Sequence, residues 1–187
     1  MIADYLEGVQ FGESMLRYSL ACPWGKVIRR KVVDNNSIRF QETSRCNDVK
    51  FSYLIGHNAK TIRADRRALY CVTYRSSSIS NSLEESRILD EIRVEAERDA
   101  FLRKNKINLP ESCFRYYRGA LDKVLANGNY VLFEKCLDTL SEYGITKEEI
   151  NALLNVGSNK KEYWRFFDYF KNRIALRTRI RRFCTLD

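Results

Sequence analysis

The sequence predicts an α+β fold, predominantly helical, in which an N-terminal helix and a small antiparallel sheet precede a C-terminal helical bundle. Before residue 76 the chain carries short runs rich in β-branched and aromatic residues, which are typical of strands. After it, apolar residues recur at three- and four-residue steps, which is typical of helices. Because short apolar runs also occur in buried helices, an all-α fold is the alternative.

The first 76 residues are expected to form an N-terminal mixed or helical domain. Residues 5–21 predict a helix that two glycines interrupt. Four runs then predict strands, and the Asp34-Asn35-Asn36 step after the first of them favours a hairpin turn, because Asn tolerates positive φ. The predicted strands are 27–33, 37–43, 49–55 and 68–74.

Residues 77–187 are expected to form a C-terminal helical domain, reached through a serine-rich linker over 76–82. Thr146 and Glu149 have the spacing of a capping box, in which each side chain satisfies a free N–H of the first helical turn. Short connections between the helices favour antiparallel neighbours in a bundle. The five predicted helices begin near Ser82, Pro110, Val131, Thr146 and Asn159, the first ends near Lys104, and the last ends near Arg182.

Length and charge limit the classes of function. A chain of 187 residues and 22.0 kDa suits one domain or two small ones. Its formal charge of +9 and pI near 9.3 favour a polyanionic partner. Acidic residues in the first 22 positions and the lack of an apolar run of ~20 residues argue against a secretion signal and a membrane span. We therefore expect no membrane insertion and an intracellular, cytoplasmic location.

Metal and nucleotide chemistry find little support in the sequence. The six cysteines are well separated, and His57 is the sole histidine, so no zinc spacing is present and reduced thiols are expected. The glycines do not cluster as they do in phosphate-cradling loops. We expect no metal, no cofactor and no catalysis.

The predicted final helix carries the strongest basic feature. Six aromatic residues within 163–170 suggest a core-filling segment, with a subunit contact or base stacking as alternatives. At 100° per residue Arg173, Arg177 and Arg181 form one stripe, and the guanidinium group suits phosphate because it donates two hydrogen bonds at once. The candidate phosphate contacts here are Arg173, Arg177 and Arg181, with Arg179, Arg182 and Lys171 beside them.

Basic residues in the first half form a second, weaker group. Arg29 and Arg30 lie in the first predicted strand, and Arg66 and Arg67 follow the third, with Lys60 and Arg63 nearby. If these clusters converge on one surface or around an oligomer, they can follow a nucleic-acid backbone through shape and charge. The predicted function is sequence-independent binding of RNA or another nucleic acid, without catalysis, by a protein that forms homo-oligomers.

Two alternatives belong to other classes of protein. A helical protein-interaction or oligomerisation module would use the same charge to bind an acidic partner. The second alternative rests on Cys22-Pro23-Trp24-Gly25 which, with His57 elsewhere, resembles in outline the nucleophile and base of small papain-like viral cysteine proteases.

The general character of the chain, which is small, basic, helix-rich and aromatic, resembles the RNA-binding silencing suppressors of plant viruses, including the closterovirus type. No single motif carries this likeness. The resemblance implies a viral origin, suppression of RNA silencing and an all-helical fold. The predicted N-terminal sheet departs from that fold.

Overall fold

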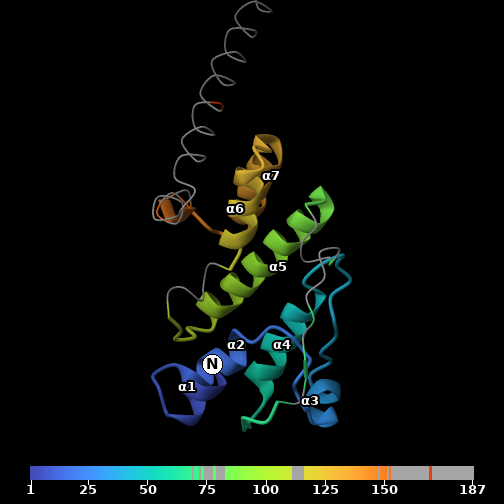
Figure 1. Cartoon of the computed structure of the whole chain (residues 1–187), viewed down its shortest axis with the longest axis vertical. Coiled ribbons are helices and arrows are strands. Elements are labelled where there is room, and N and C mark those ends of the chain that lie inside the picture. Colours follow the sequence, from blue (N-terminus) through green and yellow to red (C-terminus); the bar gives the residue numbers. More distant parts are fainter. Residues whose placement is uncertain are drawn as a thin grey trace, which may run out of the picture. The chain divides into compact units, whose positions relative to one another are not determined.

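The computed structural model describes residues 1–68, 70, 71, 73, 78, 83–110, 116–146, 148–150, 152 and 169 (Figure 1). The chain divides into two compact units, Met1–Tyr117 (unit 1) and Arg118–Asp187 (unit 2). Unit 1 contains α1 (Ile2–Leu6), α2 (Gly12–Tyr18), α3 (Arg30–Asn35), α4 (Asn47–Asn58) and α5 (Glu85–Lys104). Unit 2 contains α6 (Arg118–Ala126) and α7 (Tyr130–Glu142). None of the described helices is both long enough and apolar enough to cross a bilayer.

The predicted antiparallel sheet is wrong, because the described residues contain helices and no strand. The first predicted strand, 27–33, runs into α3, and the third, 49–55, lies inside α4. Residues 37–43 have no regular secondary structure, and 68–74 are described only in part. The part of the chain that is described is therefore mainly helical.

Packing on two opposite sides of α4 explains why its sequence resembles a strand. Val49 and Tyr53 belong to a core with Tyr18 of α2 and with α5. Phe51 and Ile55 belong to a second core with Ile38, which α3 covers. In a helix, residues two apart point about 200° from each other, so alternate positions face opposite sides. A helix buried on both sides thus has apolar residues at every second position.

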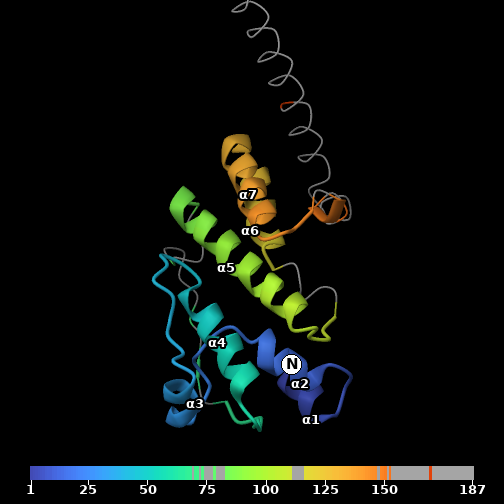
Figure 2. The ribbon, with the colours of Figure 1, turned by 180° about the vertical axis from the view of Figure 1, so that it is seen from behind.

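Close backbone contact joins α2 to α4. A Cβ atom placed on Gly56 would lie 2.0 Å from the carbonyl oxygen of Arg17, so glycine is needed for this approach. The helix predicted over 5–21 is interrupted at its glycines as expected, since α1 ends just before Gly8 and α2 begins at Gly12. Gly8 adopts a φ of 67°, which suits glycine at the turn. Figures 1 and 2 show α1 and α2 together beside α4.

Ion pairs and rings join α4 to α5, and they show that the two helices run parallel. Arg45, just before α4, pairs with Glu91 at 3.0 Å, and the Tyr53 ring lies 4.8 Å from that of Phe101. The partners therefore advance along α5 as the chain advances along α4. Figure 2 shows both helices ending toward the same end of unit 1.

Buried charges line the middle of α5. Glu95 and Arg98 form an ion pair at 2.8 Å, and the Arg98 guanidinium lies 3.8 Å from the ring centre of Tyr116. Burial raises the pKa of Glu95, although the charge of Arg98 lowers it. Both members of the ion pair lie on α5, and the contact of Arg98 with Tyr116 joins this helix to the segment after it.

The ends of the unit 2 helices are as predicted, but the helix predicted from near Pro110 is not, because Tyr116 and Tyr117 form a turn and α6 begins at Arg118. Gly128 and Gly144 adopt φ values of 67° and 78° where α6 and α7 end. The predicted capping box is confirmed, since the Thr146 amide donates to Glu149 Oε2 at 2.9 Å and the Glu149 amide donates to Thr146 Oγ1 at 3.2 Å. The predicted boundary at residue 76 stays a prediction, because most of the serine-rich stretch lies outside the described residues.

Candidate nucleic-acid interface

The strongest predicted phosphate contacts lie outside the described residues. These are Lys171, Arg173, Arg177, Arg179, Arg181 and Arg182. In the aromatic segment before them only Tyr169 is described, and its ring lies 5.2 Å from that of Tyr130 in α7. The role of the C-terminal arginines stays a prediction.

The second predicted group, which is described, is exposed and partly ion-paired. Arg30 pairs with Asp34 at 3.0 Å along α3. Arg66 and Arg67, after α4, pair at 2.9 Å and 2.7 Å with Glu7 and Asp65 respectively. Arg29 is exposed and has no ion pair with a described carboxylate. Exposed pairs contribute only ~0–1 kcal/mol, so a stronger anion can replace their carboxylates.

The parallel arrangement of α4 and α5 adds basic residues to this group. The His57 and Phe101 rings, near the ends of the two helices, lie 5.1 Å apart. Lys60 and Lys104 each follow one of these rings by three residues, so the chain segments that leave both helices start close together. We call the basic residues of the last turn of α5 and of the segments after both helices the basic end: Lys60, Arg63, Arg66, Arg67, Arg103, Lys104 and Lys106.

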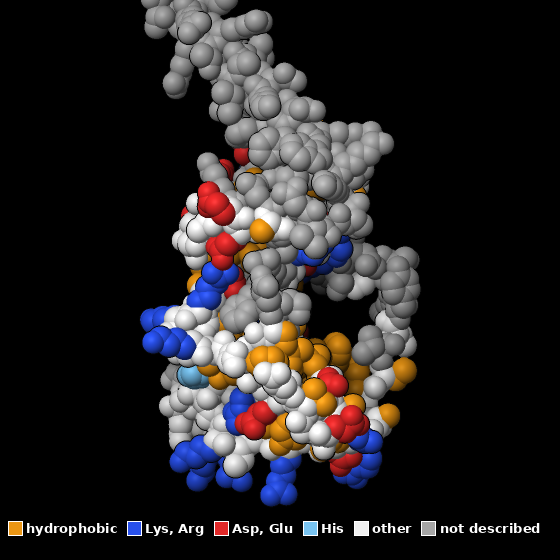
Figure 3. Space-filling view, turned by 90° about the vertical axis from the view of Figure 1, so that its left-hand side faces the viewer, with side chains coloured by type: hydrophobic (Ala, Val, Ile, Leu, Met, Phe, Trp, Pro, Cys, Tyr) orange, Lys and Arg blue, Asp and Glu red, His pale blue; other side chains and the backbone are white. Residues whose placement is uncertain are grey.

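Within the described chain, four cations of the basic end have no ion-pair partner. They are Lys60, Arg63, Lys104 and Lys106, and all four are exposed. The ends of two parallel helices carry partial negative charge, which these cations complement. On the face that Figure 3 presents, Lys and Arg side chains gather along the lower edge, with acidic side chains beside some of them.

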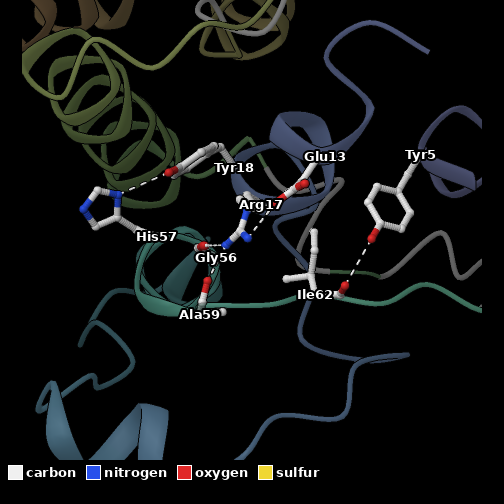
Figure 4. Close-up of polar contacts among 8 residues, drawn as sticks. All are labelled: Tyr5, Glu13, Arg17, Tyr18, Gly56, His57, Ala59 and Ile62. Carbon is white, nitrogen blue, oxygen red and sulfur yellow. Dashed lines mark hydrogen bonds and ion pairs between the residues drawn. The ribbon is translucent and has the colours of Figure 1, made fainter. Parts of the chain in front are cut away.

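Hydrogen bonds hold the segment after α4 against α1 and α2 (Figure 4). Arg17 Nη1 donates to the carbonyl oxygens of Gly56 and Ala59, each at 2.6 Å, and so satisfies carbonyls at the end of α4. The Tyr5 hydroxyl donates to the carbonyl oxygen of Ile62 at 3.1 Å. Glu13 holds Arg17 in place through an ion pair at 2.6 Å. The backbone that carries the first residues of the basic end is therefore fixed at several points.

Sequence reasoning missed Lys104 and Lys106. On α5 taken alone, charges of opposite sign lie close together, as in the Asp99–Arg103 ion pair at 3.1 Å, so the helix by itself does not indicate a basic surface. The proximity of the α4 and α5 ends depends on their parallel packing, which no local pattern in the sequence encodes. A signal was present only in the basic composition of 103–106.

The residues of the protease alternative are both described. His57 is exposed, and its Nδ1 lies 3.2 Å from the Tyr18 hydroxyl. Cys22 is half-buried as a free thiol, and among the described contacts it shares no hydrogen bond with His57. In the described part of the chain no group of three His, Cys, Asp or Glu side chains is arranged to hold a metal ion.

Comparison with known proteins gives no further guide to this surface. No protein-family model, curated protein or solved structure matches this chain.

Proposed function

We propose that this protein binds RNA or another nucleic acid without reading its sequence and without catalysing a reaction. The observation that supports this is the group of exposed cations at the basic end without an ion-pair partner in the described chain: Lys60, Arg63, Lys104 and Lys106. Such cations bind phosphates by releasing the counterions that surround the nucleic acid.

The cations lie on separate segments, which suits an extended polyanion better than a small ligand. Lys60 and Arg63 follow α4, whereas Lys104 ends α5 and Lys106 follows it. The Arg17 and Tyr5 hydrogen bonds fix the first of these two segments. Exposed lysines and arginines provide charge without a pocket shaped for a base. The affinity is therefore expected to fall steeply as the salt concentration rises and to depend only weakly on base sequence.

The test is an anisotropy titration of labelled single-stranded RNA at several salt concentrations. Changing Lys104 and Lys106 to Gln removes two cations from the basic end. The slope of log affinity against log salt concentration contains about 0.7 for each phosphate that the protein neutralises on a single strand. Its magnitude should therefore fall by about 1.4 in this variant. Adding Lys60→Gln and Arg63→Gln should double that change.

A matched control uses the same helix. Arg87 and Arg93 lie nearer the start of α5, where they pair with Glu84 at 3.0 Å and Asp90 at 2.6 Å. Changing both to Gln alters the net charge of the protein by the same amount as the Lys104 and Lys106 pair. An equal loss of affinity in both double variants would contradict binding at the basic end.

The C-terminal stripe is a second proposed contact. Changing Arg173, Arg177 and Arg181 to Glu together should abolish binding while the helical circular dichroism signal stays. Unchanged affinity would remove the stripe from the interface. A protein that binds no RNA yet self-associates independently of salt would favour the interaction-module alternative, and sedimentation of the same samples measures this.

The protease alternative and the silencing resemblance have tests of their own. A Cys22→Ala variant with intact RNA binding but lost peptide cleavage would support a protease. Suppression of RNA silencing in leaf tissue would support the plant-virus resemblance.

A further inference from the structure

An exposed aromatic pair lies outside the cores of unit 1. The rings of Trp24 and Tyr70 stack with their centroids 5.4 Å apart and their planes 12° from parallel. Trp24 is 44% exposed and Tyr70 is 60% exposed, although each ring is large enough to contribute strongly to a core. Two stacked rings at the surface still offer a further flat face to another ring.

The loop that carries Trp24 is held in place. It connects α2 to α3, and the Ser52 hydroxyl of α4 donates to the carbonyl oxygen of Ala21. The Lys26 ammonium donates to the carbonyl oxygen of Leu20. Because the loop is tied on both sides of Trp24, the indole is positioned before any ligand arrives, which lowers the entropic cost of binding.

Basic side chains flank the pair within reach of one strand. Arg67 precedes Tyr70 by three residues, which span at most ~10–11 Å, and Arg29 follows Trp24 by five residues, at most ~17–18 Å. Both arginines are exposed, and Arg29 has no described carboxylate partner. Lys26 has a different role, because burial lowers its pKa and its ammonium already has a partner.

We infer that Trp24 and Tyr70 form a stacking platform for the unpaired bases of single-stranded RNA, with Arg29 and Arg67 beside its phosphates. This inference rests on the proposed function and specifies the class of ligand. In a duplex the faces of the bases are covered by their neighbours, whereas a single strand offers each face to an aromatic ring. Every base has such a face, so stacking keeps the binding independent of sequence.

The first experiment observes the platform directly. The protein contains two tryptophans, so a Trp164→Phe variant leaves Trp24 as the sole indole reporter. A 12-nucleotide single-stranded RNA should quench its fluorescence. Inorganic polyphosphate, which has the charge but no bases, should bind without comparable quenching, and a blunt RNA duplex should quench weakly.

The second experiment measures affinity. Trp24→Ala should weaken single-stranded RNA binding about fivefold or more, in line with the loss of one stacked base, and should leave polyphosphate binding unchanged. Trp24→Phe should restore most of the affinity, because it keeps a ring. Val27→Ala is the matched control in the same loop: Val27 is 99% exposed and apolar, so its removal should change neither affinity.

The outcomes separate the two proposals. If neither RNA nor polyphosphate binds, the proposed function fails and this inference fails with it. If both bind, but RNA leaves Trp24 unquenched and Trp24→Ala binds RNA as the wild type does, the function stands and the platform is overturned. A duplex that binds as tightly as the single strand and quenches Trp24 equally would also overturn the platform.

Discussion

Replacing Gly56 by Ala tests the close contact between α2 and α4. The new Cβ would lie 2.0 Å from the Arg17 carbonyl oxygen, whereas carbon and oxygen atoms rarely approach within ~3.3 Å. The α2 backbone must therefore retreat by more than ~1 Å. That retreat would stretch both 2.6 Å hydrogen bonds from Arg17 to the end of α4.

The expected cost follows from three effects. Overpacking of this kind costs ~1–3 kcal/mol, and weakening a hydrogen bond from a charged group costs ~1.5 kcal/mol or more. Alanine stabilises a helix interior by up to ~1 kcal/mol relative to glycine, which offsets part of this cost. Gly56→Ala should thus lower the free energy of unfolding by ~2–3 kcal/mol and the melting temperature by about 6–10 °C.

The assay is thermal and urea unfolding of the Trp164→Phe background, in which Trp24 fluorescence reports on unit 1. Gly119 provides the matched control, since it also lies in a helix but has no atom within 4 Å of an added Cβ. Gly119→Ala should leave the stability of the protein unchanged or raise it by up to ~1 kcal/mol, as followed by circular dichroism. A Gly56→Ala protein as stable as the wild type would refute the account of this contact.

Two further predictions concern titratable groups whose pKa is raised by burial. Burial raises the pKa of the Glu95 carboxyl above its ordinary value of 4.5. Above pH 4.5 the unfolded chain therefore releases the carboxyl proton while the folded protein keeps it. The free energy of unfolding consequently falls as pH rises. Glu95→Gln should remove that part of the pH dependence, as measured by urea titrations from pH 4.5 to 7.5. If the free energies of unfolding of the wild type and the variant differ by the same amount at every pH, the prediction is contradicted. Burial, with Glu91 and Glu95 nearby, raises the pKa of the Cys46 thiol to about 12, so at pH 8 about one thiol in ten thousand is ionised. Iodoacetamide labelling mapped by mass spectrometry should modify the exposed Cys71 first and leave Cys46 unmodified, and equal rates at both would show that Cys46 is accessible and ionised.

The sequence predicted the helices that are packed on one side better than the helix that is packed on two. The helix predicted to end near Lys104 ends there, and the glycines after α6 and α7 mark their ends. The alternation of Val49, Phe51, Tyr53 and Ile55 instead indicated a strand. Periodicity reports how many sides of an element are buried, and a helix between two cores gives the same period as a strand.

The candidate surface was only partly predictable for a related reason. Arg29, Arg30, Arg66 and Arg67 could be proposed from local clusters of charge, and they are exposed in the structure. The Trp24–Tyr70 stack brings together residues far apart in the chain, so a local pattern could not indicate it. Contacts of this kind depend on how the helices are ordered in space.

The parallel course of α4 and α5 has a consequence for how unit 1 assembles. The Lys50–Glu97 and Ser44–Asp90 contacts join residues 47 and 46 positions apart, so each requires the closure of a long loop. An antiparallel hairpin of helices would form its first contacts after a short turn. During synthesis α4 leaves the ribosome well before α5, so at first it can pack only against α2 and α3. Docking of α5 is therefore the late step that completes unit 1.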